Sequence, residues 1–194
     1  MEFDWEHRVD TTSATIKGRD RLLGELYSPY QPTEPGLFHQ MMSSLKIDFR
    51  QFVFIDLGSG KGRALLMAAQ YPFQRVVGVE LLPSLNRIAQ ENIACYRPGE
   101  PCAIESISGD ATEYVFPAAP LVVYLFNPLP EPGLQRVVRN LERSLQDSPR
   151  PVLVLYHNPL AERLLVRSEV FRKLGGTHQY SIFGSRAHLT ILDG

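Results

Sequence analysis

The feature that most constrains the fold is a glycine-rich turn between a predicted strand and a predicted helix. The apolar run 52–55 has the length and residue types of a strand buried on both faces. Asp56 ends this run, and the segment 64–70 has a helical composition. A strand, a glycine turn and a helix in this order bring a small ligand against bare backbone at a helix N-terminus. The glycines of the turn alternate with other residues, at Gly58, Gly60 and Gly62.

The glycine spacing separates two classes of ligand. Dinucleotide-binding turns follow G-x-G-x-x-G, whereas this chain has G-x-G-x-G, with Arg63 at the position of the third dinucleotide glycine. A nicotinamide-dependent oxidoreductase that uses the acid Glu80 is therefore the weaker alternative. The sequence also has no Tyr-x-x-x-Lys or comparable set for hydride transfer.

Strands and helices alternate along the rest of the chain. We expect strands at 75–80, 102–107, 121–126 and 151–156, and helices at 17–26, 37–45, 83–95, 134–145 and 160–166. The tail 170–192 is typical of two strands around Gly175-Gly176, with a bend or bulge at Gly184. This alternation predicts an α/β fold with a doubly wound, mostly parallel sheet that is covered by helices on both faces.

Length and composition predict a single domain over 1–194, with an N-terminal helical cap at 1–45 and a Rossmann-like core at 50–194. The net charge of −1 gives no global basic field for nucleic acid. No apolar run approaches the roughly 20 residues that cross a bilayer, so we expect a cytoplasmic protein with no membrane partner. The two cysteines fit neither a disulfide framework nor a zinc site, and we predict no metal.

The segment 56–62, Asp-Leu-Gly-Ser-Gly-Lys-Gly, resembles the first motif of class I S-adenosylmethionine-dependent methyltransferases. The resemblance covers roughly residues 50–160 and implies a seven-strand sheet whose last strand runs antiparallel. It implies S-adenosylmethionine as cofactor and S-adenosylhomocysteine as product. The chain is also similar to small bacterial methyltransferases of unassigned substrate, with which it shares Val9-Asp10-Thr11. More distantly, its Gly-Ser-Gly-Lys-Gly-Arg string resembles the non-SET nucleosomal lysine methyltransferases.

The resemblance assigns cofactor-binding roles to residues at the carboxyl ends of successive strands, where ligands of open α/β sheets bind. Glu80, 24 residues after Asp56 (80 − 56), is expected to accept both ribose hydroxyls, and Leu81 to pack on the adenine. Asp110 would accept from the adenine amine, and Asp56 would hold the glycine turn and approach the methionine amine. Lys61 and Arg63 are expected to be a solvated helix start. The predicted cofactor set is Asp56, Gly58, Ser59, Gly60, Glu80, Leu81, Gly109, Asp110, Ala111 and Asn127.

Asn127, His157 and Tyr30 are the candidates for the chemistry. The segment 127–130, Asn-Pro-Leu-Pro, lies where many amino-methyltransferases carry an Asp or Asn, two prolines and an aromatic, whose oxygens accept protons from the target amine. The aromatic is missing here, which argues against a flipped nucleobase or a glutamine as substrate. The alternative is an N-cap Asn that ends the strand, and Asn158-Pro159 repeats that pattern.

His157 ends the fifth strand and is the best-placed general base, although a structural histidine is the alternative. Tyr30 lies in an irregular proline-rich segment and either lines the methyl channel or belongs to a packed linker. The sequence thus predicts a methyltransferase for an unidentified acceptor, such as a protein amine or a small molecule. A non-catalytic module that binds the cofactor is the alternative, and the oligomeric state is left open.

Overall fold

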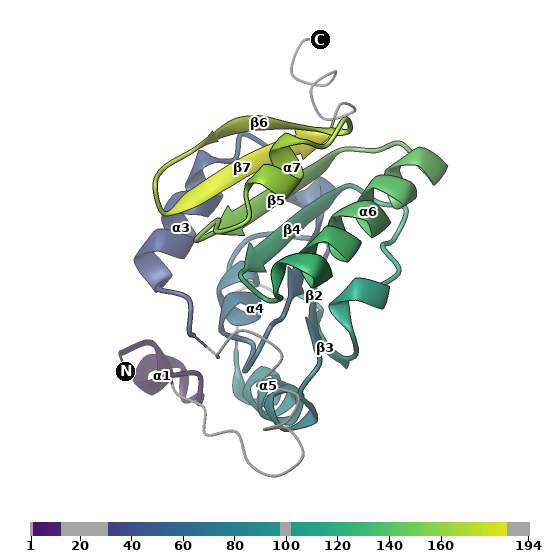
Figure 1. Cartoon of the computed structure of the whole chain (residues 1–194). Helices are drawn as coiled ribbons and strands as arrows, with labels where there is room; N and C mark the ends of the chain where they lie inside the picture. Colours follow the sequence, from purple (N-terminus) through teal and green to yellow (C-terminus); the bar gives the residue numbers. More distant parts are fainter. Residues whose placement is uncertain (1, 13–30, 98–101, 186–194) are drawn as a thin grey trace.

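The computed structural model describes residues 2–12, 31–97 and 102–185. In this part of the chain, seven strands form one twisted sheet in the order β3-β2-β1-β4-β5-β7-β6 (Figure 1). The strands are β1 (Val53–Leu57), β2 (Arg75–Glu80), β3 (Ile104–Ser108), β4 (Leu121–Phe126), β5 (Val152–His157), β6 (Phe171–Gly176) and β7 (Tyr180–Ser185).

The strand order reverses at β1, which pairs with β2 on one side and with β4 on the other. Strands β1 to β5 are parallel, and β7 runs antiparallel to both β5 and β6. The predicted seven-strand, mostly parallel sheet with an antiparallel C-terminal strand is therefore confirmed. In open α/β sheets, a reversal of this kind leaves a crevice beyond the carboxyl ends of the central strands.

Helices cover both faces of the sheet (Figure 1). One face carries α1 (Glu2–His7), α3 (Pro35–Ser44), α4 (Arg63–Ala68) and α5 (Pro83–Cys95), and the other carries η2 (Ala111–Glu113), α6 (Glu131–Asp147) and α7 (Arg163–Val166). A short 3-10 turn, η1 (Phe49–Gln51), precedes β1. Prolines fit the first turn of a helix because the amide they lack has no partner there, and α3 and α5 both begin with one.

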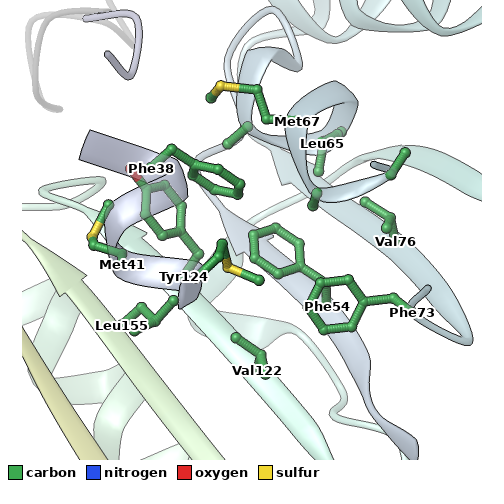
Figure 2. Close-up of a cluster of buried hydrophobic side chains, with 14 of the residues drawn as sticks. Phe38, Met41, Phe54, Leu65, Met67, Phe73, Val76, Val122, Tyr124 and Leu155 are labelled. Atoms are coloured by element: carbon green, nitrogen blue, oxygen red, sulfur yellow. The ribbon is translucent and has the colours of Figure 1, made fainter. Parts of the chain in front are cut away.

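Alternate residues of each strand enter two separate cores. Phe54, Val122 and Tyr124 pack against Phe38 and Met41 of α3, as Figure 2 shows, whereas the intervening residues of β1 and β4 pack against α6. The even-numbered residues of β1 and β4 therefore point toward α3 and α4. Asp56 follows the same alternation, so its side chain lies on this face, at the carboxyl end of the sheet.

The C-terminal hairpin differs from its prediction. Gly175 and Gly176 lie within β6 instead of separating the two strands. The irregularity falls between Lys173 and Gly175, and Gly184 pairs regularly on both sides, so the expected bend at Gly184 is wrong. The reason is the position of each strand: β7 is paired on both sides and buried, whereas β6 forms the edge, where bulges are tolerated. The helix predicted at 17–26 lies outside the described residues.

Candidate functional site

A pocket opens at the carboxyl ends of β1, β2 and β4, where the strand order reverses. Gly109 does not line it, and its backbone N–H instead donates to the Glu80 carbonyl at 2.9 Å. Tyr30 lies outside the described residues, although residues 31–33 form part of the wall. The lining includes the other predicted cofactor residues: Asp56, Gly58, Ser59, Gly60, Glu80, Leu81, Asp110, Ala111 and Asn127.

The glycine turn is held from β2. The Val79 carbonyl accepts from the backbone N–H groups of Gly58 (2.8 Å) and Ser59 (3.1 Å). The buried Glu80 carboxylate accepts from Gly60 N at 2.7 Å through Oε2 and from Leu82 N at 2.8 Å through Oε1. Glu80, and not Asp56 as expected, therefore fixes the turn. A carboxylate has about four acceptor positions, so these amide contacts are compatible with ligand hydroxyls.

Gly58 has no room for a side chain. Its φ is +84°, and a Cβ there would lie 2.5 Å from Cβ of Pro128. We expect Gly58→Ala to lower the free energy of unfolding by about 2 kcal/mol, because left-handed backbone and the clash both act against it. Urea unfolding measures this loss. Gly109→Ala is the matched control, since its Cβ would meet only Val79 Cγ1 at 4.0 Å, and an equal loss in both variants would contradict the assignment.

Asp56 differs from Glu80 in having no hydrogen-bond donor among the described residues. Its side chain is 4% exposed and faces the pocket beside Tyr124, its register partner on β4. Burial and the nearby negative charge of Glu80 raise the pKa of Asp56 to about 8. The pocket thus contains a carboxyl group that has no counter-charge within residues 2–12, 31–97 and 102–185.

Lys61 and Arg63 are buried, at 3% and 7% exposure, so the expectation of a solvated helix start is wrong. Lys61 Nζ lies 2.7 Å from Asp10 Oδ1, and Asp10 also exchanges backbone hydrogen bonds with the side chain of Asn92. These contacts hold the Val9-Asp10-Thr11 segment against the glycine turn. Both cations therefore serve the docking of the N-terminal segment.

Arg63 connects three separate parts of the chain. Its Nη2 contacts Asp4 Oδ1 at 2.9 Å, its Nε donates to Thr11 Oγ1 at 2.6 Å, and its Nη1 donates to the Thr33 carbonyl at 3.5 Å. Its guanidinium also lies 5.3 Å from the ring of Phe3 in α1. The polar composition of residues 1–20 gave no sign of α1, because this helix is fixed by contacts to a residue more than fifty positions away.

A hydrogen-bonded chain of three side chains runs from the wall of the pocket to His157. The Tyr124 hydroxyl is 3.0 Å from Thr33 Oγ1 and 2.8 Å from His157 Nδ1, and the His157 ring stacks on Phe126 at 3.8 Å. Burial lowers the pKa of His157 to about 4 against the opposing charge of Glu34, and burial raises the pKa of Tyr124 well above 10. His157 itself does not line the pocket and reaches it through Tyr124.

Asn127 lines the pocket at the end of β4, in a left-handed conformation with φ +42°. The N-cap of α6 is Pro130, so Asn127 is not an N-cap residue and that alternative is wrong. Asn158 adopts the same conformation at the end of β5 (φ +49°) but does not line the pocket. Non-glycine residues in this region are uncommon and often mark functional sites.

Sequence reasoning missed Tyr124, Phe126 and Arg63 as parts of the pocket wall. Tyr124 and Phe126 lie inside an apolar strand run. Only their alternation with neighbours that pack against α6 distinguishes them. In the described residues, no group of three or more His, Cys, Asp or Glu is arranged to hold a metal, and no helix has the length and hydrophobicity to span a bilayer.

The pocket fits a nucleoside that carries a positively charged amino-acid chain. Asp56 offers an uncompensated carboxyl group to the positive charge, and Ser59 Oγ is a buried hydroxyl without a partner among the described residues. Leu81, Leu82 and Ala111 provide apolar surface for a planar base.

Comparisons with known proteins agree with this geometry. Residues 54–148 match a family model described as a methyltransferase domain. An RNA methyltransferase from Salinibacter ruber, solved with S-adenosylhomocysteine, is 23% identical, with 79% of this chain and 92% of that chain covered and a TM-score of 0.53. The PH0226 protein from Pyrococcus horikoshii OT3 is 18% identical, with 95% and 98% covered and a TM-score of 0.56. A search of curated proteins gives no match.

The doubly wound sheet has the class I methyltransferase fold. Residues 54–148 carry the methyltransferase domain that the family model describes, so the chain is a methyltransferase. This result decides for methyl transfer over the nicotinamide-dependent alternative and for an enzyme over a non-catalytic module.

Proposed function

We propose that the enzyme methylates an amine nitrogen of a protein or a small molecule in the pocket between the glycine turn and Asn127. The observation that carries this proposal is the charge of the lining. It contains Asp56, Glu80 and Asp110, and its single described cation, Arg63, is bound to Asp4. Such a pocket favours cationic and neutral ligands over phosphate-bearing ones that would need a free cation.

Within this proposal, Glu80 accepts the ribose hydroxyls, Leu81 packs on the base, and Asp110 accepts from the adenine amine. One oxygen of Asp110 already accepts from Thr112 N at 2.8 Å, which fixes its side chain at the rim of the pocket. When bound, S-adenosylmethionine supplies a methyl group that its positive sulfur has already activated. The protein therefore has two tasks, which are to align the acceptor and to receive its proton.

Asn127 is our candidate for aligning the acceptor, because its amide oxygen can accept from an amine N–H at the end of β4. His157 as the proton acceptor stays a prediction, and it now requires Tyr124 as an intermediate, since the Tyr124 hydroxyl contacts His157 Nδ1. Tyr30 stays a prediction outside the described residues. The cytoplasmic location is likewise proposed, and the free thiols of Cys95 and Cys102 support it.

A nucleobase acceptor is the second candidate. Phe126 lines the pocket and is backed by His157, which gives a planar ligand an aromatic wall that the residue at position 129 does not provide. The Salinibacter ruber neighbour is an RNA methyltransferase, and this supports testing RNA alongside protein.

The deciding experiment incubates a cell extract with the enzyme and methyl-labelled S-adenosylmethionine, and sorts the label into protein, nucleic-acid and small-molecule fractions. We expect label in protein or small molecules that is stable to ribonuclease and absent without enzyme. Label confined to RNA would replace the amine proposal with the nucleobase candidate. No transfer to any fraction would contradict both the amine proposal and the nucleobase candidate.

Glu80→Ala and Asp110→Ala test the cofactor assignment. Each is expected to weaken S-adenosylhomocysteine binding by about 1–3 kcal/mol, or roughly 5- to 150-fold in Kd, because ligand groups lose their buried acceptor. Isothermal calorimetry measures the affinity. Glu113→Ala is the matched control, since Glu113 is exposed on η2 close to Asp110 and does not line the pocket. Wild-type affinity in both test variants would refute the assignment.

A further inference from the structure

Asp56 has no cation paired with it in the part of the chain that the structure describes. Asp56 and Glu80 end neighbouring strands and are 4% and 6% exposed. Glu80 is stabilised by two backbone N–H groups, whereas Asp56 has no hydrogen-bond donor among the described residues. Glu80 therefore remains the carboxylate of the pair, and Asp56 faces its negative charge.

The other charged or titratable groups that the structure describes around Asp56 do not neutralise it. Arg63 of α4 lines the pocket but is bound to Asp4, Thr11 and Thr12. Tyr124 of β4 adds a neutral hydroxyl that already contacts Thr33 and His157, and Asp110 adds a further acid at the rim. A buried carboxylate in this setting is costly, so Asp56 must hold either a proton or a cationic ligand.

We propose that the Asp56 carboxyl group holds a proton in the ligand-free enzyme and releases it to solvent when the cationic methyl donor binds. The exchange is balanced: one proton leaves the carboxyl oxygen, and the positive charge of the ligand takes its place beside the resulting carboxylate. The inference depends on the proposed function, because it requires S-adenosylmethionine in this pocket.

The exchange distinguishes the donor from the product. S-adenosylmethionine carries a sulfonium and an ammonium against one carboxylate, whereas S-adenosylhomocysteine has lost the sulfonium charge. Asp56 is therefore ionised more completely beside the donor than beside the product. After methyl transfer, Asp56 takes up part of a proton from solvent, which weakens binding of the neutral product. Asp56 is thus a residue that determines specificity for the charged ligand.

Calorimetry of the full chain tests the proposal without any acceptor. Binding of S-adenosylmethionine at pH 7 is measured in phosphate and in Tris, whose different ionisation enthalpies reveal the number of protons released. With the pKa of Asp56 raised to about 8, we expect release of most of one proton at pH 7 and a smaller fraction at pH 8.5. S-adenosylhomocysteine should release fewer protons at pH 7.

Asp56→Asn tests whether Asp56 is the source of the proton, because the Asn amide is isosteric with the protonated acid and cannot ionise. We expect no proton release from this variant and an affinity that does not change with pH, whereas the wild-type affinity rises about tenfold from pH 6 to pH 7. Asp110→Asn is the matched control at the rim of the same pocket, and it should keep the wild-type proton release even if its affinity falls.

Three results separate the possible failures. Donor binding without proton release in the wild type would overturn the inference and leave the proposed function intact. Persistent release in Asp56→Asn would also overturn it, since another group would then be the proton source. Failure of both nucleosides to bind the wild type would instead refute the proposed function. The wild-type measurement at two pH values remains decisive should Asp56→Asn not fold.

Discussion

Replacement of Arg63 by alanine is expected to lower the free energy of unfolding by about 3 kcal/mol. The guanidinium joins Asp4, Thr11 and the Thr33 carbonyl, and its ion pair with Asp4 is mostly shielded from solvent. Burial opposes ionisation of Asp4, but hydrogen bonds from Thr11, Thr12 and Arg63 outweigh it and lower the pKa of Asp4 to about 2. The variant would therefore leave an ionised, half-buried carboxylate without its cation, which is the costly way to break such a pair.

Urea unfolding at pH 7 measures the loss, and Arg87→Ala provides the control. Arg87 pairs with Glu91 at 3.7 Å on the surface of α5, and both side chains are more than half exposed. Exposed pairs of this kind contribute below about 1 kcal/mol. Equal losses in the two variants would contradict the view that Arg63 fixes the N-terminal segment. A loss confined to Arg63→Ala would support it.

The sheet was predictable because its strands are apolar and separated by strong breaks. The predicted strands 75–80 and 121–126 and the predicted helix 83–95 have the bounds that the structure gives to β2, β4 and α5. Buried strands and proline-started helices carry their signal locally, in composition and in the residues that end them. The order of the central strands then followed from the class of fold.

The N-terminal docking could not be predicted in the same way. Lys61 and Arg63 stand at a helix start, where charged side chains usually face solvent. Their burial depends on Asp10 and Asp4, about fifty residues earlier in the chain. A single sequence gives no measure of such a long-range pair, and neither charge pattern nor helical period indicates it.

The candidate site was predictable in part. Parallel strand ends predicted that Asp56, Glu80 and Asp110 would gather at one edge, and all three line one pocket. The same alternation could have identified Tyr124, because it is the register partner of Asp56 on β4 and shares its face of the sheet. The alternation could not show which acid fixes the glycine turn and which faces the ligand. This depends on which carboxylate accepts from the amides of the turn, and Glu80 does so.

The stability of the ligand-free enzyme is expected to fall as the pH rises from 6.5 to 8. Burial and Glu80 raise the pKa of Asp56 from 3.8 to about 8, so the folded state holds a proton that the unfolded chain has released. The free energy of unfolding then falls by about 1 kcal/mol per pH unit and levels off above pH 8. The buried His157, with its pKa lowered from 6.5 to about 4, gives a slope of opposite sign that is largest below pH 6.5 and fades above pH 7, so the upper part of the window reports chiefly on Asp56.

Asp56→Asn should abolish this slope, because the amide cannot ionise, and should be more stable than the wild type at pH 8. Chemical denaturation at several pH values from 6.5 to 8 measures the slope in both proteins. Asp110→Asn should retain the wild-type slope, since Asp110 lies at the rim and its carboxylate caps η2. A wild-type stability that stays level across this window would mean that Asp56 is already ionised in the empty pocket, and the charge would then have to be stabilised by reorganisation of the surrounding groups.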